Sequence, residues 1–342
     1  MVNSTSETPI VEAKNLKKWF TLKKGISSTF GMSQETKIRA VDGVDLQVLD
    51  GEVFGIVGES GCGKTTLGKL LIRLLEPTDG LLSFRGTEIT HLSMKEMRKF
   101  RREMQIIYQD PFSSLPVRFK VSRILTEPFQ IHKLISSKAD GVERASELLN
   151  DVGLVPTDVF LEKYPNELSG GQRQRVGIAR AIALKPKFIL ADEPVSMLDL
   201  SVRAEILNLI LKLKKDYGLT LLLITHDLAS AQFMCNRVAI MYVGKIVEVG
   251  SGDEIFSNPY HPYTMLLKAA LPTLDPRTKH HLSQLPTEEE IANPIDLPPG
   301  CRFHPRCIYA QDLCKRKEPE LRTYLDREVA CHAIGDWLRP ED

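Results

Sequence analysis

The sequence predicts an α/β fold built around a buried, largely parallel β-sheet. Two short apolar runs, "KFILAD" and "LTLLLITH", have the composition of buried parallel strands, and a third run spans Val53–Val57. Between the first two lies "VRAEILNLILKLKKDYG", whose apolar residues recur at helical spacing. A glycine-rich turn follows the third run and leads into a segment with a leucine-rich helical face. Strands alternating with helices in this way are typical of α/β proteins.

The remaining elements follow from local patterns. Residues 11–50 contain two strand-like stretches around a Gly/Ser/Lys-rich segment that we expect to be a loop. Helices are predicted over 93–103, within 119–153, and after Tyr164 up to Pro186. Six prolines between residues 271 and 300 indicate a linker, and a small C-terminal unit follows it.

Composition excludes several classes of protein. With 45 basic and 44 acidic residues the net charge is +1, which does not favour a nucleic-acid partner. No apolar run approaches the roughly 18 residues of a membrane-spanning helix, and the N-terminus lacks a signal-peptide pattern. We therefore expect a cytosolic protein that works at a membrane only through a partner. Four of its six cysteines lie after residue 300, where metal binding or redox chemistry is more typical than disulfides.

The segment "GESGCGKT", residues 58–65, has the spacing of a phosphate-binding loop. Its glycines let the backbone N–H groups and the next helix N-terminus face an anion. Lys64 would contact the outer phosphates, and the Thr65 hydroxyl would bind Mg²⁺. The expected nucleotide contacts are Gly58, Ser60, Gly61, Gly63, Lys64, Thr65 and Thr66.

A second motif, "FILADE", ends a predicted buried strand in two carboxylates. Asp192 is suited to hold Mg²⁺, through water, because Mg²⁺ retains several waters. Glu193 is suited to act as the general base that polarises an attacking water. Strand-end carboxylates alone are common, so the prediction depends on their pairing with the phosphate loop.

Three further motifs complete a recognisable set: "LSGGQ" at 168–172, Gln109 in "IIYQDP", and His226 at the end of "LLLITH". Over residues 10–255 the chain closely resembles the ATP-binding-cassette (ABC) ATPases. The resemblance implies a P-loop NTPase fold of the ABC type, with ATP and Mg²⁺ as cofactors. Its nucleotide-binding domain would span residues 1–258 and include a helical subdomain at about 109–171.

The resemblance also implies roles for single residues. Two cassettes would pair head to tail, so that Ser169 and Gly171 cover the ATP of the partner; a helix that opens at this motif directs free N–H groups to one spot. Gln109 would bind Mg²⁺ and sense the attacking water. His226 would contact the γ-phosphate, and Asp199 would lie at the dimer seam. Because Lys64, Glu193 and His226 are all present, we expect ATP hydrolysis.

Other positions near these motifs are less determined. Phe20 aligns with the aromatic residue that stacks on adenine, Trp19 is a competing candidate, and a core role is the alternative for either. Met197 replaces the usual alanine, which raises the question of local packing. Helix N-termini can lower the pKa of a thiol, so Cys62 is expected to be sensitive to alkylation.

Finer matches, such as "QDPFSSL" and "NPYHPYT", resemble the oligopeptide/dipeptide importer ATPases, particularly the F-type subunit. This implies a D-type ATPase partner, two membrane permeases, an extracellular solute-binding protein and a peripheral position on the cytoplasmic face of the membrane. Relatives also transport oligosaccharides or nickel. "SLPVR" at 114–118 departs from the usual "SLNPR" near the expected permease contact, and "HPYT" predicts a helix start or a packing role. The rival hypotheses are a soluble cassette acting on ribosomes or DNA, and an iron–sulfur redox switch with a vestigial cassette.

The C-terminal cysteines have the spacing C-x5-C-x6-C-x16-C. The tight pairs of most zinc sites are absent, and the ligand spacing of [4Fe–4S] clusters varies, so the residues alone leave both open. Resemblance to the importer ATPases favours a [4Fe–4S] cluster, with zinc as the alternative, in a metal- or cluster-binding domain at 259–342. Arg302, His304 and Arg306 would be neighbours rather than ligands. The expected ligands are Cys301, Cys307, Cys314 and Cys331.

Overall fold

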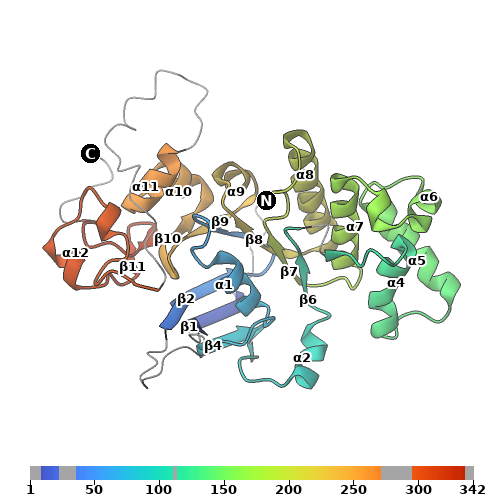
Figure 1. Ribbon diagram of the computed structural model, residues 1–342, viewed down its shortest axis with the longest axis horizontal. Helices are drawn as coiled ribbons and strands as arrows, with labels where there is room; N and C mark the ends of the chain where they lie inside the picture. The colour runs from blue at the N-terminus through green and yellow to red at the C-terminus, as the bar shows by residue number, and fades with distance from the viewer. Residues whose placement is uncertain (1–8, 23–35, 111–113, 271–294, 336–342) are drawn as a thin grey trace, which may run out of the picture. The chain divides into compact units, whose positions relative to one another are not determined.

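The computed structural model describes residues 9–22, 36–110, 114–270 and 295–335, and Figure 1 labels their helices and strands. The chain divides into two compact units. The helical unit comprises Leu92–Leu223 with Leu49–Glu52, and the phosphate-loop unit comprises the described residues of Glu7–Val48, Val53–His91 and Ile224–Asp342. Most of the predicted proline-rich linker and of the Gly/Ser/Lys-rich loop lies outside the described residues.

The phosphate-loop unit contains an antiparallel sheet in the order β2-β1-β4-β5. Val11 of β1 lies opposite Phe84 of β4, and helix α1 packs against β1 (Figure 1). This confirms the two strand-like stretches expected within residues 11–50. The elements are β1 (Pro9–Leu22), β2 (Thr36–Leu49), β4 (Asp79–Phe84), β5 (Thr87–Glu88) and α1 (Lys64–Leu71).

The same unit holds five strands of a second sheet in the order β11-β12-β10-β9-β3. β3 and β9 are parallel, and every residue of β3 is buried, as its apolar run predicts. β12 pairs antiparallel with β10, with Val329 opposite Glu248, so the C-terminal segment extends the sheet of the cassette. The strands are β3 (Val53–Val57), β9 (Arg237–Tyr242), β10 (Lys245–Ser251), β11 (Arg322–Tyr324) and β12 (Arg327–Val329).

Short helices complete this unit. Buried side chains of the three helices between residues 228 and 269 join those of β9 and β10 in one hydrophobic cluster that includes Tyr242, Tyr263 and Phe303. Phe303, from the C-terminal segment, therefore packs in the same core as the cassette strands. The helices are α9 (Leu228–Met234), α10 (Gly252–Ser257), α11 (Pro262–Ala269), η3 (His304–Arg306) and α12 (Asp312–Arg316).

The helical unit places α-helices around strands in the order β8-β7-β6. β6 and β7 are parallel, with Met104 opposite Phe188, and β7 is buried throughout. The first four residues of β8 belong to this unit. Its elements are α2 (Met94–Phe100), β6 (Met104–Ile107), α4 (Val121–Ile131), α5 (Lys138–Asp151), α6 (Thr157–Glu162), η1 (Pro165–Glu167), α7 (Gly170–Ile182), β7 (Phe188–Asp192), α8 (Leu200–Tyr217) and β8 (Thr220–Thr225).

The predicted helices are present with shifted ends. The charged segment at 93–103 forms α2, which ends at Phe100 before β6 begins, and the pattern at 119–153 resolves into α4 and α5. A Ser93–Glu96 capping box fixes the start of α2. Within the described residues no helix has the length and apolar character needed to cross a membrane. The domain boundary at residue 258 stays a prediction.

Candidate functional site

The phosphate loop, residues 58–65, connects β3 to α1 in a form that only glycine allows at two positions. A Cβ atom on Gly58 would lie 2.2 Å from the carbonyl oxygen of Met241. At Gly63 the backbone φ is +109°, and a Cβ atom would lie 2.1 Å from the carbonyl oxygen of Ala40. The sequence motif therefore reflects close backbone packing around the loop as well as the space that a phosphate needs.

The polar groups of this loop gather at the start of α1. The ammonium of Lys64, which is 5% exposed, donates hydrogen bonds of 2.8 Å to the carbonyl oxygens of Gly58 and Glu59. Gly63 takes the N-cap position and supplies no side-chain cap to the first turn of α1. Helix N-termini of this kind bind anions through backbone N–H groups. Of the other predicted contacts, Ser60 and Gly61 are exposed, whereas Thr65 and Thr66 are half-buried.

The "HPYT" segment adds a contact to this loop that the sequence did not predict. His261 caps α11 by accepting the backbone N–H of Tyr263 at 3.0 Å, which confirms the expected helix start. The fully buried carboxylate of Glu248 accepts the backbone N–H groups of Tyr260 and His261. The hydroxyl of Tyr263 accepts the backbone N–H of Glu59 at 2.9 Å. Only three-dimensional contact reveals this link, because more than 200 residues separate the two positions.

His226 lies just after β8 on a turn that is firmly held. The carboxylate of Asp227 caps α9 by accepting the backbone N–H groups of Ala229 and Ser230 at 3.1 and 3.3 Å. The hydroxyl of Thr225 accepts the backbone N–H of Asp227 at 2.9 Å. His226 itself is exposed, so its imidazole is accessible to a ligand on a turn of fixed geometry.

The two aromatic candidates for adenine stacking differ in their surroundings. The indole N–H of Trp19 donates to Asp42 at 2.9 Å, and the guanidinium of Arg39 lies 5.2 Å from its ring centroid. Phe20 is 38% exposed, with the ammonium of Lys18 at 5.4 Å from its ring centroid. Trp19 is therefore committed to contacts within the protein, whereas Phe20 presents an accessible ring.

In the helical unit, the structure brings Gln109 and Glu193 together. The side-chain amide of Gln109 donates to Glu193 Oε2 at 3.0 Å. Asp192, at the end of β7, is 4% exposed. Glu193 has a left-handed backbone with φ of +45°, a conformation that costs a non-glycine residue about 1–3 kcal/mol and clusters at functional sites. Its carbonyl accepts the backbone N–H of Ser196 at 3.2 Å, which holds the turn.

The "LSGGQ" motif forms a capping box at the start of α7, a role that the sequence analysis missed although its S-x-x-Q spacing is diagnostic. Ser169 Oγ accepts the backbone N–H of Gln172 at 3.3 Å, and the Ser169 N–H donates to Gln172 Oε1 at 3.1 Å. A Cβ atom on Gly171 would lie 2.8 Å from Val202 Cγ1. Asp199 is exposed at the N-cap position of α8 and makes no side-chain cap.

Two expectations about neighbouring residues change. Cys62 is 2% exposed, and burial raises its thiol pKa although the charge of Lys64 lowers it, so the expected sensitivity to alkylation is wrong. Met197 is 59% exposed, so replacing alanine there disturbs no core packing.

The structure does not support the predicted metal-binding unit. The four C-terminal cysteines are free thiols, and within the residues that the structure describes no group of three or more His, Cys, Asp or Glu side chains could hold a metal ion. Burial raises the pKa of Cys301 to about 11 and that of Cys307 to about 12. The backbone still joins the cysteine segments, since the Cys301 N–H donates to the Cys314 carbonyl at 2.8 Å.

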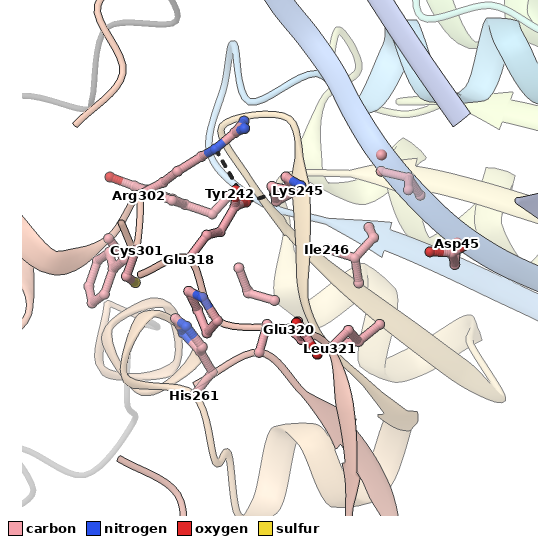
Figure 2. A pocket seen from close by; sticks show the side chains of 16 residues that line it. Asp45, Tyr242, Lys245, Ile246, His261, Cys301, Arg302, Glu318, Glu320 and Leu321 are labelled. Atoms are coloured by element: carbon pink, nitrogen blue, oxygen red, sulfur yellow. Dashed lines mark ion pairs between the residues drawn. The ribbon is translucent and has the colours of Figure 1, made fainter. Parts of the chain in front are cut away.

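A separate cavity of about 430 Å³ lies beside Cys301, Arg302 and His261 (Figure 2). The buried guanidinium of Arg302 is paired with Asp42 and donates to the Val243 carbonyl at 2.6 Å. Burial lowers the pKa of His261 to about 3, so this imidazole is neutral. The cavity lining includes no residue of the phosphate loop, and it is therefore distinct from the phosphate site.

Comparison with known proteins decides the family. Residues 41–196 match the family described as "ABC transporter", and residues 247–314 match "Oligopeptide/dipeptide transporter, C-terminal region". The oligopeptide transport ATP-binding protein AppF of Bacillus subtilis is 40% identical over 97% of this chain and 99% of its own length. The chain belongs to the ATP-binding proteins of the oligopeptide/dipeptide ABC transporters. YkfD of Bacillus subtilis, whose name also refers to oligopeptide transport, is 43% identical over 89% of this chain and 92% of its own.

Solved structures agree with this family assignment. A dimeric bacterial ABC transporter cassette, MJ0796, is 31% identical and matches with a TM-score of 0.61 over 70% of this chain and 98% of its own. The predicted P-loop ABC fold with a mixed α/β sheet is thereby confirmed. As a member of this ABC family, the chain is an ATP-hydrolysing enzyme.

Proposed function

We propose that this chain is the ATPase subunit of a membrane importer for di- and oligopeptides. One observation carries the proposal: a complete set of ABC motifs is followed, in the same chain, by the C-terminal region that describes oligopeptide/dipeptide transporters. Similar proteins of nearly the same length are named for oligopeptide transport. Since the ATPase has no need to contact the cargo, the peptide assignment depends on these relatives.

The residues of the site divide the work of hydrolysis. The N–H groups of the phosphate loop and Lys64 would hold the triphosphate. Asp192, Thr65 and Gln109 are oxygen ligands of the type that Mg²⁺ prefers, and the ion would neutralise phosphate charge when bound. Glu193, oriented by its hydrogen bond from Gln109, would accept a proton from water.

As that proton moves to Glu193, the water oxygen forms a bond to the γ-phosphorus and the bond from phosphorus to the bridging oxygen of ADP breaks. His226, accessible on its turn, would donate a hydrogen bond to the γ-phosphate. Phe20 would stack on adenine, since Trp19 is held by Asp42. ADP and inorganic phosphate are the products.

A second cassette would complete the site. The exposed Ser169 opens the 13-residue helix α7, and Gly171 keeps the backbone close to α8, so this surface is suited to cover a nucleotide bound by a partner. We assign this chain to the F-type, with a D-type paralogue as the partner. Asp199, exposed at the start of α8, would lie at the seam of that heterodimer.

The membrane partners would be two permeases supplied by an extracellular solute-binding protein, with this chain on the cytoplasmic face. Crosslinking in native membranes followed by mass spectrometry tests this assembly. The expected products join this chain to a D-type ATPase and to permeases. Reconstituted complex should then hydrolyse ATP faster when the binding protein carries a peptide; stimulation by an oligosaccharide or by nickel instead would contradict the peptide cargo.

The number of the cysteines leaves both a [4Fe–4S] cluster and zinc open, and only the resemblance to the importer ATPases favours the cluster. Among the described residues the geometry does not fit a metal site. Anaerobic purification tests the cluster hypothesis. Iron with a broad absorbance near 400 nm would support a cluster. Zinc without iron would support the alternative. The absence of both metals would contradict a metal site at these cysteines.

A further inference from the structure

Glu59 joins the phosphate loop to two side chains of the C-terminal part of the chain. Its carboxylate accepts two hydrogen bonds from Arg306, at 2.9 Å from Nη1 and 3.0 Å from Nη2. Its backbone N–H donates to the hydroxyl of Tyr263, and its carbonyl accepts the ammonium of Lys64. Three groups of one loop residue are thus held, two of them by side chains that follow the last ABC motif.

Arg306 is itself fixed in place. It is 9% exposed, and its guanidinium lies 5.9 Å from the ring centroid of Tyr242 and 5.8 Å from that of Phe303. The hydrogen bonds that Arg306 donates to Glu59 raise the guanidinium pKa, so Arg306 is always charged. A two-pronged pair between a planar guanidinium and a carboxylate restricts both distance and orientation.

The charge of this pair bears on the ligand. Glu59 is the second residue of a loop that binds a polyanion, and an unpaired carboxylate at that position would repel phosphate. Arg306 neutralises this charge and holds the carboxylate in one orientation through two hydrogen bonds. Its presence should therefore favour nucleotide binding, by position and by charge.

The segment that carries Arg306 is short and closely connected. Turn η3, His304–Arg306, lies between Cys301 and Cys307, and the Cys307 N–H donates to the His304 carbonyl at 3.2 Å. A change in the fold of this cysteine segment would move Arg306. The contact at Glu59 is therefore a route by which the C-terminal region can affect the phosphate loop.

We propose that Arg306 and Tyr263 are positioning residues for ATP, which hold Glu59 so that the nucleotide affinity of the loop depends on the folded C-terminal region. This inference rests on the proposed binding of ATP at residues 58–65. Neither residue touches the reacting atoms. Their substitution should therefore change the dissociation constant of ATP and the KM more than it changes kcat.

The test is a charge-pair cycle in the full-length chain, read as the dissociation constant of a fluorescent ATP analogue in the presence of Mg²⁺. Arg306→Ala should weaken binding by about five- to thirtyfold, because it leaves the carboxylate of Glu59 unpaired beside the phosphates. Adding Glu59→Gln to Arg306→Ala removes that charge and should restore affinity to within about threefold of wild type. Tyr263→Phe, which removes the acceptor of the Glu59 N–H, should weaken binding by about threefold.

Arg327→Ala is the matched control. Arg327 is also a buried C-terminal arginine, but its partners are Glu248, Asp326 and backbone carbonyls at Glu254 and Asn258. The Arg327→Ala variant should lower the melting temperature and leave ATP affinity within about twofold of wild type. If Arg306→Ala does not fold, Arg306→Lys keeps the charge but loses the two-pronged geometry, and should show a smaller loss of affinity.

Each outcome decides between two statements. If wild type binds no ATP, the proposed function fails. Should wild type bind ATP while Arg306→Ala binds equally well, only the positioning role fails. A loss of affinity in Arg327→Ala as large as that in Arg306→Ala, or no recovery in the double variant, would mean general destabilisation and would overturn the inference.

Discussion

The phosphate loop and the turn at Glu193, which we propose to act in the same reaction, are fixed by different means. In the loop, backbone packing determines the structure: neither Gly58 nor Gly63 has space for a Cβ atom. At Glu193, the backbone has a left-handed conformation, and the side chain is oriented by the hydrogen bond from Gln109. We therefore expect nucleotide binding to depend on the path of the main chain in the loop. ATP hydrolysis should depend on a few side chains that can be substituted without changing that path.

The largest expected effect separates these two functions. Glu193→Gln removes the proton acceptor but keeps the size and hydrogen bonding of the side chain, so kcat should fall by about 10²–10⁴-fold while ATP stays bound. Phosphate release by the assembled importer and nucleotide retention on this chain measure the two parts. Gln109→Ala removes one hydrogen bond to the Glu193 carboxylate and one proposed Mg²⁺ ligand but keeps the proton acceptor, so it should lose less. Full turnover by Glu193→Gln would exclude it as the general base.

The loop side of the comparison predicts the opposite pattern. Gly63→Ala would place a Cβ atom against the Ala40 carbonyl at an unfavourable φ, and should lower stability by about 2–4 kcal/mol together with ATP affinity. Gly61→Ala is the control, because its φ of +81° is also positive but no atom lies within 4 Å of the added Cβ. Thermal denaturation and nucleotide titration distinguish them. Equal losses in the two variants would show that strain, and not the close packing, matters.

The stability of the phosphate-loop unit should depend on pH, and His261 and Glu248 should contribute to this dependence in opposite directions. Burial lowers the pKa of His261 to about 3, against about 6.5 in an unfolded chain. The unfolded state therefore takes up the proton first, and stability present above pH 6.5 is lost as the pH falls. From pH 6.5 to 5 the loss is about 1.5 kcal/mol.

Glu248, which accepts the His261 backbone N–H, acts in the opposite sense, because burial raises its pKa and protonation then favours the folded state. His261→Asn keeps a capping acceptor without a titrating ring and isolates the histidine contribution. Its melting temperature should change less between pH 6.5 and 5 than that of wild type. An unchanged slope would assign the pH dependence to other groups.

The sequence predicted those parts of the molecule in which residue type and backbone geometry imply each other. The apolar runs predicted the buried strands β3 and β7. The glycines at 58 and 63 were predictable because the backbone of the loop leaves no space for a Cβ atom there. The resemblance to the ABC ATPases implied that Gln109 and Glu193 act on the same water, and the two side chains are hydrogen-bonded.

Side-chain contacts between distant segments could not be predicted in this way. The cysteine pattern gave four ligand-type residues, but their arrangement depends on how turn η3, α12 and the strand β12 pack. Arg306 appeared only as a neighbour of those cysteines. Its partner Glu59 lies 247 positions away, and a local pattern carries no information on such a pair.

The smallest expected change in stability concerns Ser169, which serves both as a helix cap and as a proposed contact to the ATP of a partner cassette. Ser169→Ala removes the acceptor of the Gln172 N–H and should destabilise α7 by about 1 kcal/mol, measured by thermal denaturation. Ser169→Asp retains a cap of equal quality and so keeps stability, but it places a negative charge where the partner's phosphates would lie. That variant should fold normally and lose ATP hydrolysis in the assembled complex. If it hydrolyses ATP at the wild-type rate, Ser169 acts as a helix cap alone.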